Sequence, residues 1–89
     1  MKLIGKVHVI LPLIEGETEK GPWKRRDLVL TLDNGRHLAI TYGGDHVDVI
    51  SSLKTGDTVE AECYPESRAY GDKWFTNLRG VMLHRLVVQ

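Results

Sequence analysis

One tryptophan and three cations are contiguous in this chain of 89 residues, as Trp23-Lys24-Arg25-Arg26. A nucleobase that stacks on an aromatic ring gains about 1–3 kcal/mol, and adjacent cations can neutralise the phosphates beside it. Trp23 and Arg25 have the same parity in an extended segment, so both are predicted to lie on one face of a strand. The segment is therefore a candidate site for single-stranded nucleic acid. The alternative is that Trp23 caps one end of the core while the cations are solvated.

A second cluster of cations and aromatic rings follows in a hairpin predicted at residues 67–73 and in the strand after it. Its candidate binding residues are Arg68, Tyr70, Lys73, Trp74 and Arg79. Among these rings, Tyr70 is the one most expected to be exposed, because it lies at a Gly-Asp turn. Trp74 and Phe75 are adjacent, so in a regular strand one is predicted to be buried and the other available. Cations interleaved with rings on a projecting hairpin can hold an extended nucleic-acid strand.

The overall charge does not favour polyanions. Twelve basic residues balance twelve acidic ones, which leaves a formal net charge of +0 and a pI near 6.9. A chain without excess positive charge has no long-range attraction for phosphates, so any binding must come from a local patch. Carboxylates on the first predicted loop and the fourth predicted strand weaken such a patch. They are Glu15, Glu17, Glu19, Glu60 and Glu62. We therefore expect weak, salt-dependent binding.

Catalytic signatures are absent from the sequence. It contains no nucleophile elbow, phosphate-binding glycine loop, dinucleotide fingerprint or zinc-protease pair. The four histidines are scattered and have no metal-ligand spacing, and residues 43–48 predict a turn and a helix cap rather than a metal loop. These observations predict a protein that is not an enzyme and that has no cofactor or metal.

Cys63 is the only cysteine, so no disulfide can form within the chain and a reducing compartment is expected. Its parity in the fourth predicted strand points inward, where a thiol behaves as a small apolar side chain. No apolar run approaches the roughly 20 residues of a membrane span, and no secretory signal is present at the start of the chain. We expect a cytoplasmic protein with no membrane partner.

The two clusters must be positioned by short strands, because alternating apolar residues recur along the whole chain. The first strand is predicted over Leu3–Ile14, with Gly5, Val7, Val9 and Leu11 on one parity, and residues 15–22 are predicted to form an exposed loop. Trp23–Leu32 and Arg36–Tyr42 are predicted to form a hairpin around Asp33-Asn34-Gly35, because this turn supplies residues that tolerate positive φ. Their predicted inward residues are Leu28, Leu30, Leu32, Leu38 and Ile40.

The second half of the chain predicts one helix and two further strands. Asp45 can cap a short helix in which Val47, Ile50 and Leu53 recur at three-residue spacing. A turn at residues 54–57 then leads into a strand with Val59, Ala61 and Cys63 facing inward. Pro65 is predicted to end the pairing of this strand or to make it an edge strand. The last strand is predicted over Trp74–Val88, with a break near Gly80.

Five antiparallel strands with one helix between the third and the fourth are the elements of an OB-fold, a partly open barrel. The fold class predicted is therefore all-β, a five-stranded antiparallel OB-fold barrel in one domain over residues 1–89. An SH3-like barrel is the alternative, but it usually lacks a helix at this point. In an OB-fold, strands two and three and the loops between strands one and two and between four and five bind oligonucleotides. Both clusters fall at those places.

Several motifs also carry a resemblance. They are I-x-G-K-V near the start, G-x-W-K-R-R-D-L-V-L before the first hairpin, L-K-x-G-D-x-V-E, and S-R-x-Y-x-x-K-W-F-T-x-L-R-G. From Ile4 to Leu83 the chain resembles a small bacterial family of uncharacterised OB-fold domains, which is similar to single-stranded DNA-binding proteins. The resemblance implies the fold and favours single-stranded DNA over RNA as a partner. It does not include the acidic C-terminal tail of bacterial single-stranded DNA-binding proteins, since this chain ends Arg85-Leu86-Val87-Val88-Gln89.

Two functions remain open from the sequence. The first is a non-catalytic module that binds single-stranded DNA or RNA through the aromatic and basic residues named above. The second is a protein-interaction module or a homodimer or homotetramer in which the same aromatic residues are buried between subunits, because aromatic residues and arginine are also enriched in protein interfaces.

Overall fold

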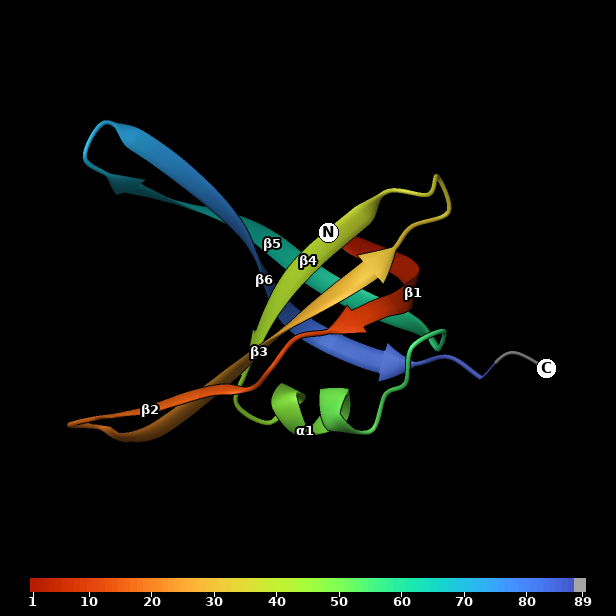
Figure 1. Ribbon diagram of the computed structural model, residues 1–89, viewed down its shortest axis with the longest axis horizontal. Coiled ribbons are helices and arrows are strands. Elements are labelled where there is room, and N and C mark those ends of the chain that lie inside the picture. Colours follow the sequence, from red (N-terminus) through yellow and green to blue (C-terminus); the bar gives the residue numbers. More distant parts are fainter. Residues whose placement is uncertain (88–89) are drawn as a thin grey trace.

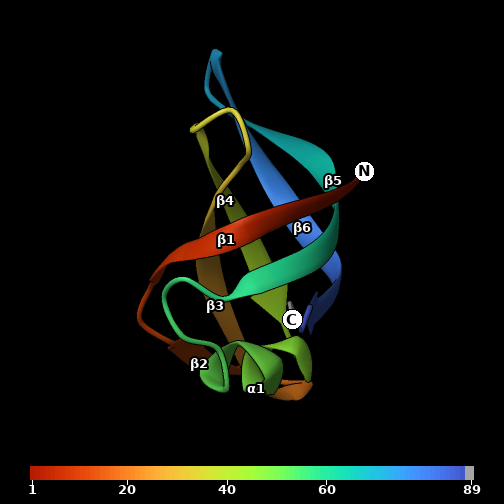
Figure 2. The ribbon, with the colours of Figure 1, turned by 90° about the vertical axis from the view of Figure 1, so that its right-hand side faces the viewer.

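A computed structural model of the protein describes residues 1–87 and consists mainly of strands (Figure 1). The elements are β1 (Lys2–Ile10), β2 (Ile14–Thr18), β3 (Gly21–Thr31), β4 (His37–Gly43), α1 (His46–Ser51), β5 (Thr58–Tyr70) and β6 (Lys73–Arg85). The six strands form one sheet in the order β1-β5-β6-β4-β3-β2. Since β1 also pairs with β3, the sheet closes on itself. In Figure 2 this closing strand, β1, lies in front. The Val88 end of the predicted last strand lies outside the described residues.

The predicted hairpin between β3 and β4 is confirmed. Leu28 pairs with Ile40 and Leu30 with Leu38, and the turn closes with a hydrogen bond of 2.8 Å from the Leu32 N–H to the Arg36 carbonyl. Gly35 adopts a φ of 81°, which glycine tolerates without a steric cost. The helix is also where the sequence placed it, with Val47 and Ile50 buried. Asp45 is the N-cap residue of this helix, as predicted, but its side chain makes no capping hydrogen bond.

Val9 and Leu11 were predicted on the same face as Val7, and this prediction is wrong because β1 contains a bulge. Val7 pairs with Leu30 whereas Val9 pairs with Val29, so two steps along β1 match one step along β3. The extra residue exchanges the two faces of the strand. Val7 is consequently buried, while Val9 and the following Leu11 are exposed.

Two hairpins extend beyond the closed part of the sheet and project toward the same side in Figure 1. The β2–β3 arm (residues 14–25) replaces the exposed loop predicted for residues 15–22, so the sheet has six strands rather than five. The β5–β6 arm (residues 64–79) continues through Pro65, which pairs with Leu78. Pro65 does not end the strand, because the pairing of β1 with β5 stops at Glu62 and leaves β5 with a free edge beyond it. This outcome matches the edge-strand alternative of the prediction.

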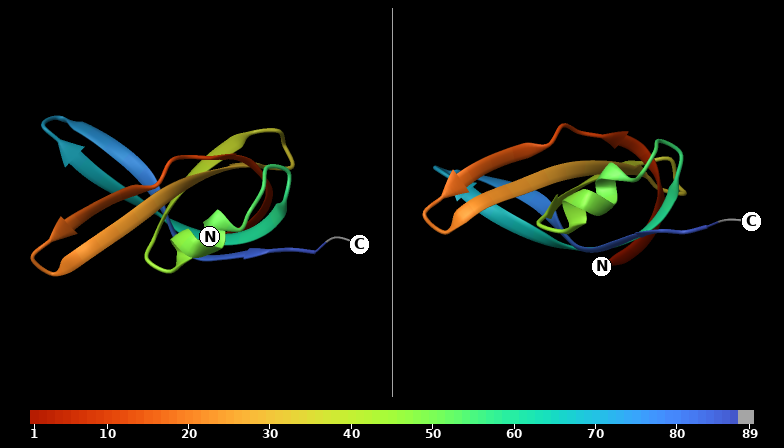
Figure 3. Two further views of the ribbon diagram at one scale, coloured as in Figure 1. Left: turned by 60° about the horizontal axis from the view of Figure 1, so that its bottom comes forward. Right: turned by 90° about the horizontal axis from the view of Figure 1, so that it is seen from below.

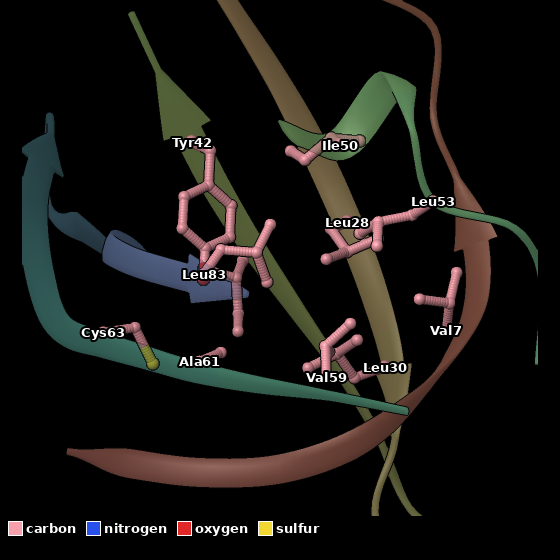
Figure 4. Close-up of a cluster of buried hydrophobic side chains, with 11 residues drawn as sticks. Val7, Leu28, Leu30, Tyr42, Ile50, Leu53, Val59, Ala61, Cys63 and Leu83 are labelled. Atoms are coloured by element: carbon pink, nitrogen blue, oxygen red, sulfur yellow. The ribbon is translucent and has the colours of Figure 1, made fainter. Parts of the chain in front are cut away.

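The core lies inside the closed sheet, with α1 across one end (Figures 2 and 3). Figure 4 shows the cluster of apolar side chains contributed by β1, β3, β4, α1, β5 and β6. The three predicted inward residues of β5, Val59, Ala61 and Cys63, are all buried. Tyr42 is the largest fully buried side chain, and its hydroxyl donates a 2.9 Å hydrogen bond to the Met82 carbonyl. Among the described residues, no helix is long and apolar enough to cross a membrane.

A second bulge lies in β6 beside this tyrosine. Glu62 of β5 pairs with Met82, and the next residue, Cys63, pairs with Gly80, so Val81 is the extra residue. The break predicted near Gly80 is therefore a bulge inside a strand that continues to Arg85. The bulge lets β6 follow the closed sheet on one side and the β5–β6 arm on the other.

Candidate nucleic-acid interface

A groove of about 790 Å³ runs over the outer face of the sheet between the two arms. Its walls and floor come from β3, β4, β6 and the distal half of β5. The lining residues are Trp23, Lys24, Arg25, Asp27, Thr41, Gly43, Gly44, Glu66, Arg68, Tyr70, Phe75, Asn77, Leu78, Arg79 and Gly80. Strands two and three of the prediction, now β3 and β4, form its centre, which is where the fold class was expected to bind oligonucleotides.

Strand alternation places several of the lining side chains on one face. Arg25 and Asp27 are two residues apart on β3, and Thr41 of β4 is the direct partner of Asp27. Thr41 in turn is paired with Arg79 of β6, which continues the same face across the sheet. In an extended strand every second residue points the same way, so these side chains form one row.

The indole of Trp23 lies against the backbone of β2. Gly16 is the cross-strand partner of Trp23, and a Cβ at position 16 would lie 2.5 Å from Cζ2 of the ring. The guanidinium of Arg25 is 5.8 Å from the ring centroid, within the range of a cation–π interaction. Trp23 is 41% exposed, so it is neither a plug in the core nor fully solvated. The predicted alternative, a tryptophan that caps the core, is not what the structure shows.

Tyr70 and Phe75 form the aromatic surface of the opposite arm. Their ring centroids are 5.7 Å apart in an edge-to-face arrangement. Both rings are more than half exposed. Arg68 is the cross-strand partner of Phe75, which brings a guanidinium to the same face of the arm.

The groove contains four cations and two carboxylates. Lys24 is engaged by Asp48 of α1, with Nζ 3.1 Å from the carboxylate. Glu66 pairs with two arginines of the groove, at 3.6 Å from Arg68 and 3.5 Å from Arg79. These pairs are solvent-exposed, so each contributes about 0–1 kcal/mol and opens readily for a competing anion. The groove therefore carries a small positive excess in a protein of zero net charge.

Six of the nine predicted binding residues line this groove: Trp23, Lys24, Arg25, Arg68, Tyr70 and Arg79. Arg26 does not line the groove, because its guanidinium is hydrogen-bonded elsewhere. Its Nε donates a 2.7 Å hydrogen bond to the Leu11 carbonyl, and its terminal nitrogen reaches the Ser51 hydroxyl at 3.4 Å. Lys73 is also outside the lining set.

Trp74 is the most exposed of the aromatic side chains, at 71%, and it is not in the groove. It pairs with Ala69 on the face opposite to Phe75. The prediction that one of Trp74 and Phe75 would be buried is wrong, because the arm projects beyond the core and neither face of it is covered. The two residues do point to opposite faces, as strand alternation requires.

Five polar or aromatic lining residues were not among the predicted binding residues: Asp27, Thr41, Glu66, Phe75 and Asn77. Phe75 was recognised only as one of two alternatives. Asn77 has the parity of Phe75 and Arg79, so strand alternation alone could have found it. Asp27 and Thr41 meet through the register of the β3–β4 hairpin, which the alternation along either strand alone does not report.

Burial raises the pKa of two ionisable groups of the core. Burial raises the pKa of the Tyr42 hydroxyl, and the nearby Cys63 adds to the effect. Burial likewise raises the pKa of the Cys63 thiol. Both groups are neutral near pH 7 and lie inside the core rather than in the groove. Within residues 1–87, no three histidine, cysteine or carboxylate side chains gather as a metal-binding group.

Solved structures with the same fold cover almost the whole chain. The second OB-fold domain of replication protein A from Methanococcus maripaludis has a TM-score of 0.73 at 18% identity, over 99% of this chain and 84% of that chain. The mitochondrial single-stranded DNA-binding protein of S. cerevisiae has a TM-score of 0.66 at 11% identity, over 97% and 92%. The small single-stranded DNA-binding protein of Streptomyces coelicolor has a TM-score of 0.58 at 17% identity, over 98% and 93%.

These similarities confirm the predicted OB-fold, with its helix after the hairpin of β3 and β4. At such low identities they show the fold and not the activity. No protein with a curated description matches the chain in sequence. A family model matches residues 2–83, and the chain therefore belongs to the family described as a domain of unknown function, DUF3127.

Proposed function

We propose that this protein binds single-stranded nucleic acid, with DNA favoured over RNA, in the groove between the β2–β3 arm and the β5–β6 arm, without catalysing a reaction. The observation that carries the proposal is the convergence of the two arms. Trp23 and Arg25 from one arm and Arg68, Tyr70 and Phe75 from the other line a single groove, although more than 40 residues separate them in the sequence.

Rings and cations have separate roles in this proposal. Exposed aromatic rings offer stacking surfaces for bases, at about 1–3 kcal/mol for each base. The guanidinium groups of Arg25, Arg68 and Arg79 neutralise phosphates, and Arg68 and Arg79 exchange the Glu66 carboxylate for a phosphate. Because stacking does not depend on base identity, much of the binding tolerates any sequence.

The charge distribution sets the expected strength. The groove combines four cations with two carboxylates, and the protein as a whole has no net charge. Affinity then comes from a few local contacts and decreases steeply with salt, since each phosphate contact releases counterions. The structural neighbours described as single-stranded DNA-binding proteins support this class of partner by analogy of fold.

Fluorescence anisotropy of labelled oligo-dT, about 12 nucleotides long, at low salt tests the proposal. The wild type should bind in the micromolar range, and the double variant Arg68→Ala, Arg79→Ala should bind more weakly, with a salt slope reduced by about 1.4. Arg36→Ala with Arg85→Ala is the matched control, because both arginines are exposed and lie outside the groove. No binding by the wild type, or equal losses in the two double variants, would refute the proposal.

A second function is favoured by Trp74. This indole is 71% exposed on the face of the β5–β6 arm that points away from the groove. Tryptophan is a frequent anchor of protein interfaces, so this face is a candidate contact for another protein or another copy of the chain. Light scattering of the wild type and of Trp74→Ala over a range of concentrations tests it. A larger species that Trp74→Ala abolishes supports the second function, and a monomer throughout excludes self-association.

A further inference from the structure

The floor of the groove contains a carboxylate that forms no ion pair with any of residues 1–87. This residue is Asp27, which is half-buried in the middle of β3. The hydroxyl of Thr41, its direct partner on β4, donates a 2.7 Å hydrogen bond to its Oδ1. The other groove carboxylate, Glu66, is neutralised by two arginines. Asp27 is therefore the negative charge in the groove that remains uncompensated.

Neither the strand conformation nor binding of phosphates accounts for an aspartate at position 27. Aspartate is disfavoured in the interior of strands. A carboxylate in a groove also repels phosphates, so it weakens any contact that runs along the backbone of a nucleic acid. A carboxylate can instead accept hydrogen bonds from the edge of a base whose phosphates lie against the arginines.

The hydrogen-bonding groups around Asp27 determine which base edge can bind to it. The Thr41 hydroxyl already donates its proton to the carboxylate, so both residues present acceptor oxygens to the groove. The Watson–Crick edge of guanine presents two adjacent donors, the N1–H and the N2 amino group. Thymine presents one N–H between two carbonyl oxygens, and these oxygens are repelled by the carboxylate. Cytosine and adenine have one amino group each and are intermediate.

We propose that Asp27, held by Thr41, reads the donor edge of a base, so that the groove prefers single strands containing guanine to strands of thymine. This inference rests on the proposed function and adds a base preference to it. The preference is superimposed on stacking and phosphate contacts that any strand can make. A good bidentate pair typically discriminates between bases about fivefold or more.

Competition at low salt among three oligonucleotides of equal length tests the inference. They are oligo-dT, a strand that repeats dT-dT-dG, and the same strand with inosine in place of guanine, which lacks only the N2 amino group. The spacing avoids runs of guanine. For the wild type we expect the guanine strand to bind about fivefold tighter than oligo-dT, with the inosine strand between them.

Asp27→Asn is the decisive variant, because it keeps the shape of the side chain and removes the charge. It should lose the preference for guanine, and its affinity for oligo-dT should rise, because the groove no longer contains a carboxylate that repels phosphates. Asp33→Asn, in the exposed β3–β4 turn, is the matched control and should keep the preference. Thr41→Val keeps the carboxylate but removes the hydrogen bond that orients it, so it should reduce the preference even if Asp27→Asn does not fold.

The outcomes separate this inference from the function on which it rests. Equal wild-type affinity for the three strands, or an unchanged preference in Asp27→Asn, overturns the base-reading role and leaves single-strand binding intact. No binding of any strand at high micromolar protein overturns both.

Discussion

Gly80 of β6 lies beneath the ring of Tyr42, in a position where any side chain would overlap the phenol. Two residues further along, the Met82 carbonyl accepts the hydrogen bond from the Tyr42 hydroxyl. The bulge at Val81 lies between these two contacts. Tyr42 thus connects β4 to β6 inside the core. It is adjacent to Thr41, whose pairing with Arg79 forms part of the groove floor. The shape of the groove depends on this buried contact.

Replacing Gly80 with alanine should therefore destabilise the protein. The added methyl group would collide with the Tyr42 ring, which is fully buried. Overpacking of this kind costs about 1–3 kcal/mol of unfolding free energy, measurable by urea denaturation. Gly43→Ala is the control, because its Cβ would lie 3.5 Å from the Lys24 carbonyl, an ordinary contact. Equal stability of Gly80→Ala and the wild type would show that β6 does not pack on Tyr42 as described.

Stability should decrease at alkaline pH. Burial raises the pKa of Tyr42 above its ordinary value of 10.0, so the unfolded chain ionises at a lower pH than the folded protein. The stabilisation that follows from this difference is complete below about pH 10 and is lost as the pH rises toward the folded pKa. The raised pKa of Cys63 acts with the same sign from its ordinary value of 9.0. Urea denaturation between pH 7 and 11 measures the loss.

Tyr42→Phe and Cys63→Ala separate the two contributions. Tyr42→Phe should cost about 1 kcal/mol at neutral pH, because the Met82 carbonyl loses its donor. It should also flatten the pH dependence above pH 10, whereas Cys63→Ala should flatten mainly the earlier part. A pH dependence that is identical in the wild type and both variants would contradict the burial of these groups.

The position of the Trp23 indole should depend on Gly16. A methyl group at position 16 would lie 2.5 Å from Cζ2 and 2.7 Å from Cε2, so Gly16→Ala must displace the ring. In a Trp74→Phe background, where Trp23 is the only indole, we expect the emission maximum to shift to longer wavelength and oligo-dT to bind more weakly. The unfolding free energy should change little, because the β2–β3 arm lies outside the core. An unchanged emission maximum would mean that the ring does not lie on Gly16.

Arg25 and Arg26 should have different roles although they are adjacent. Arg25 lines the groove, whereas Arg26 donates hydrogen bonds to the Leu11 carbonyl and the Ser51 hydroxyl. Arg25→Ala should weaken oligo-dT binding and leave stability unchanged. Arg26→Ala should lower the unfolding free energy by about 1–2 kcal/mol and leave the affinity of the folded protein nearly unchanged. If Arg25→Ala lowered stability and Arg26→Ala weakened binding instead, the assignment of Arg25 to the groove would be wrong.

The sequence predicted those parts of the fold in which one face of an element is buried. The alternation of Leu28, Leu30 and Ile40, and the spacing of Val47 and Ile50, report burial directly, so the hairpin and the helix were predicted correctly. Strand β2 was missed because neither face of the β2–β3 arm packs on the core, so residues 15–20 are glycine or polar and show no apolar alternation. The bulge after Val7 was missed because one extra residue changes the faces without changing the composition.

The candidate site divides in the same way. Contiguous clusters such as Trp23 with Arg25 were visible, since strand parity places them on one face. Parity also separates Arg26 from Arg25, but it does not show which residues of a projecting arm face the groove, because both faces of such an arm are exposed. Asp27 and Thr41 meet only through the pairing of β3 with β4, and the register of that pairing is a property of the folded sheet.

The two indoles offer the most direct test of the central claim, because Trp23 lines the groove and Trp74 lies on the other side of the β5–β6 arm. Trp74→Phe leaves Trp23 as the only indole, and Trp23→Phe leaves Trp74. On titration with oligo-dT at low salt, the emission of Trp23 should be quenched to saturation, while that of Trp74 should stay constant. Quenching of Trp74 with no response from Trp23, or no response from either at high micromolar protein, would contradict the assignment of this groove to single-stranded nucleic acid.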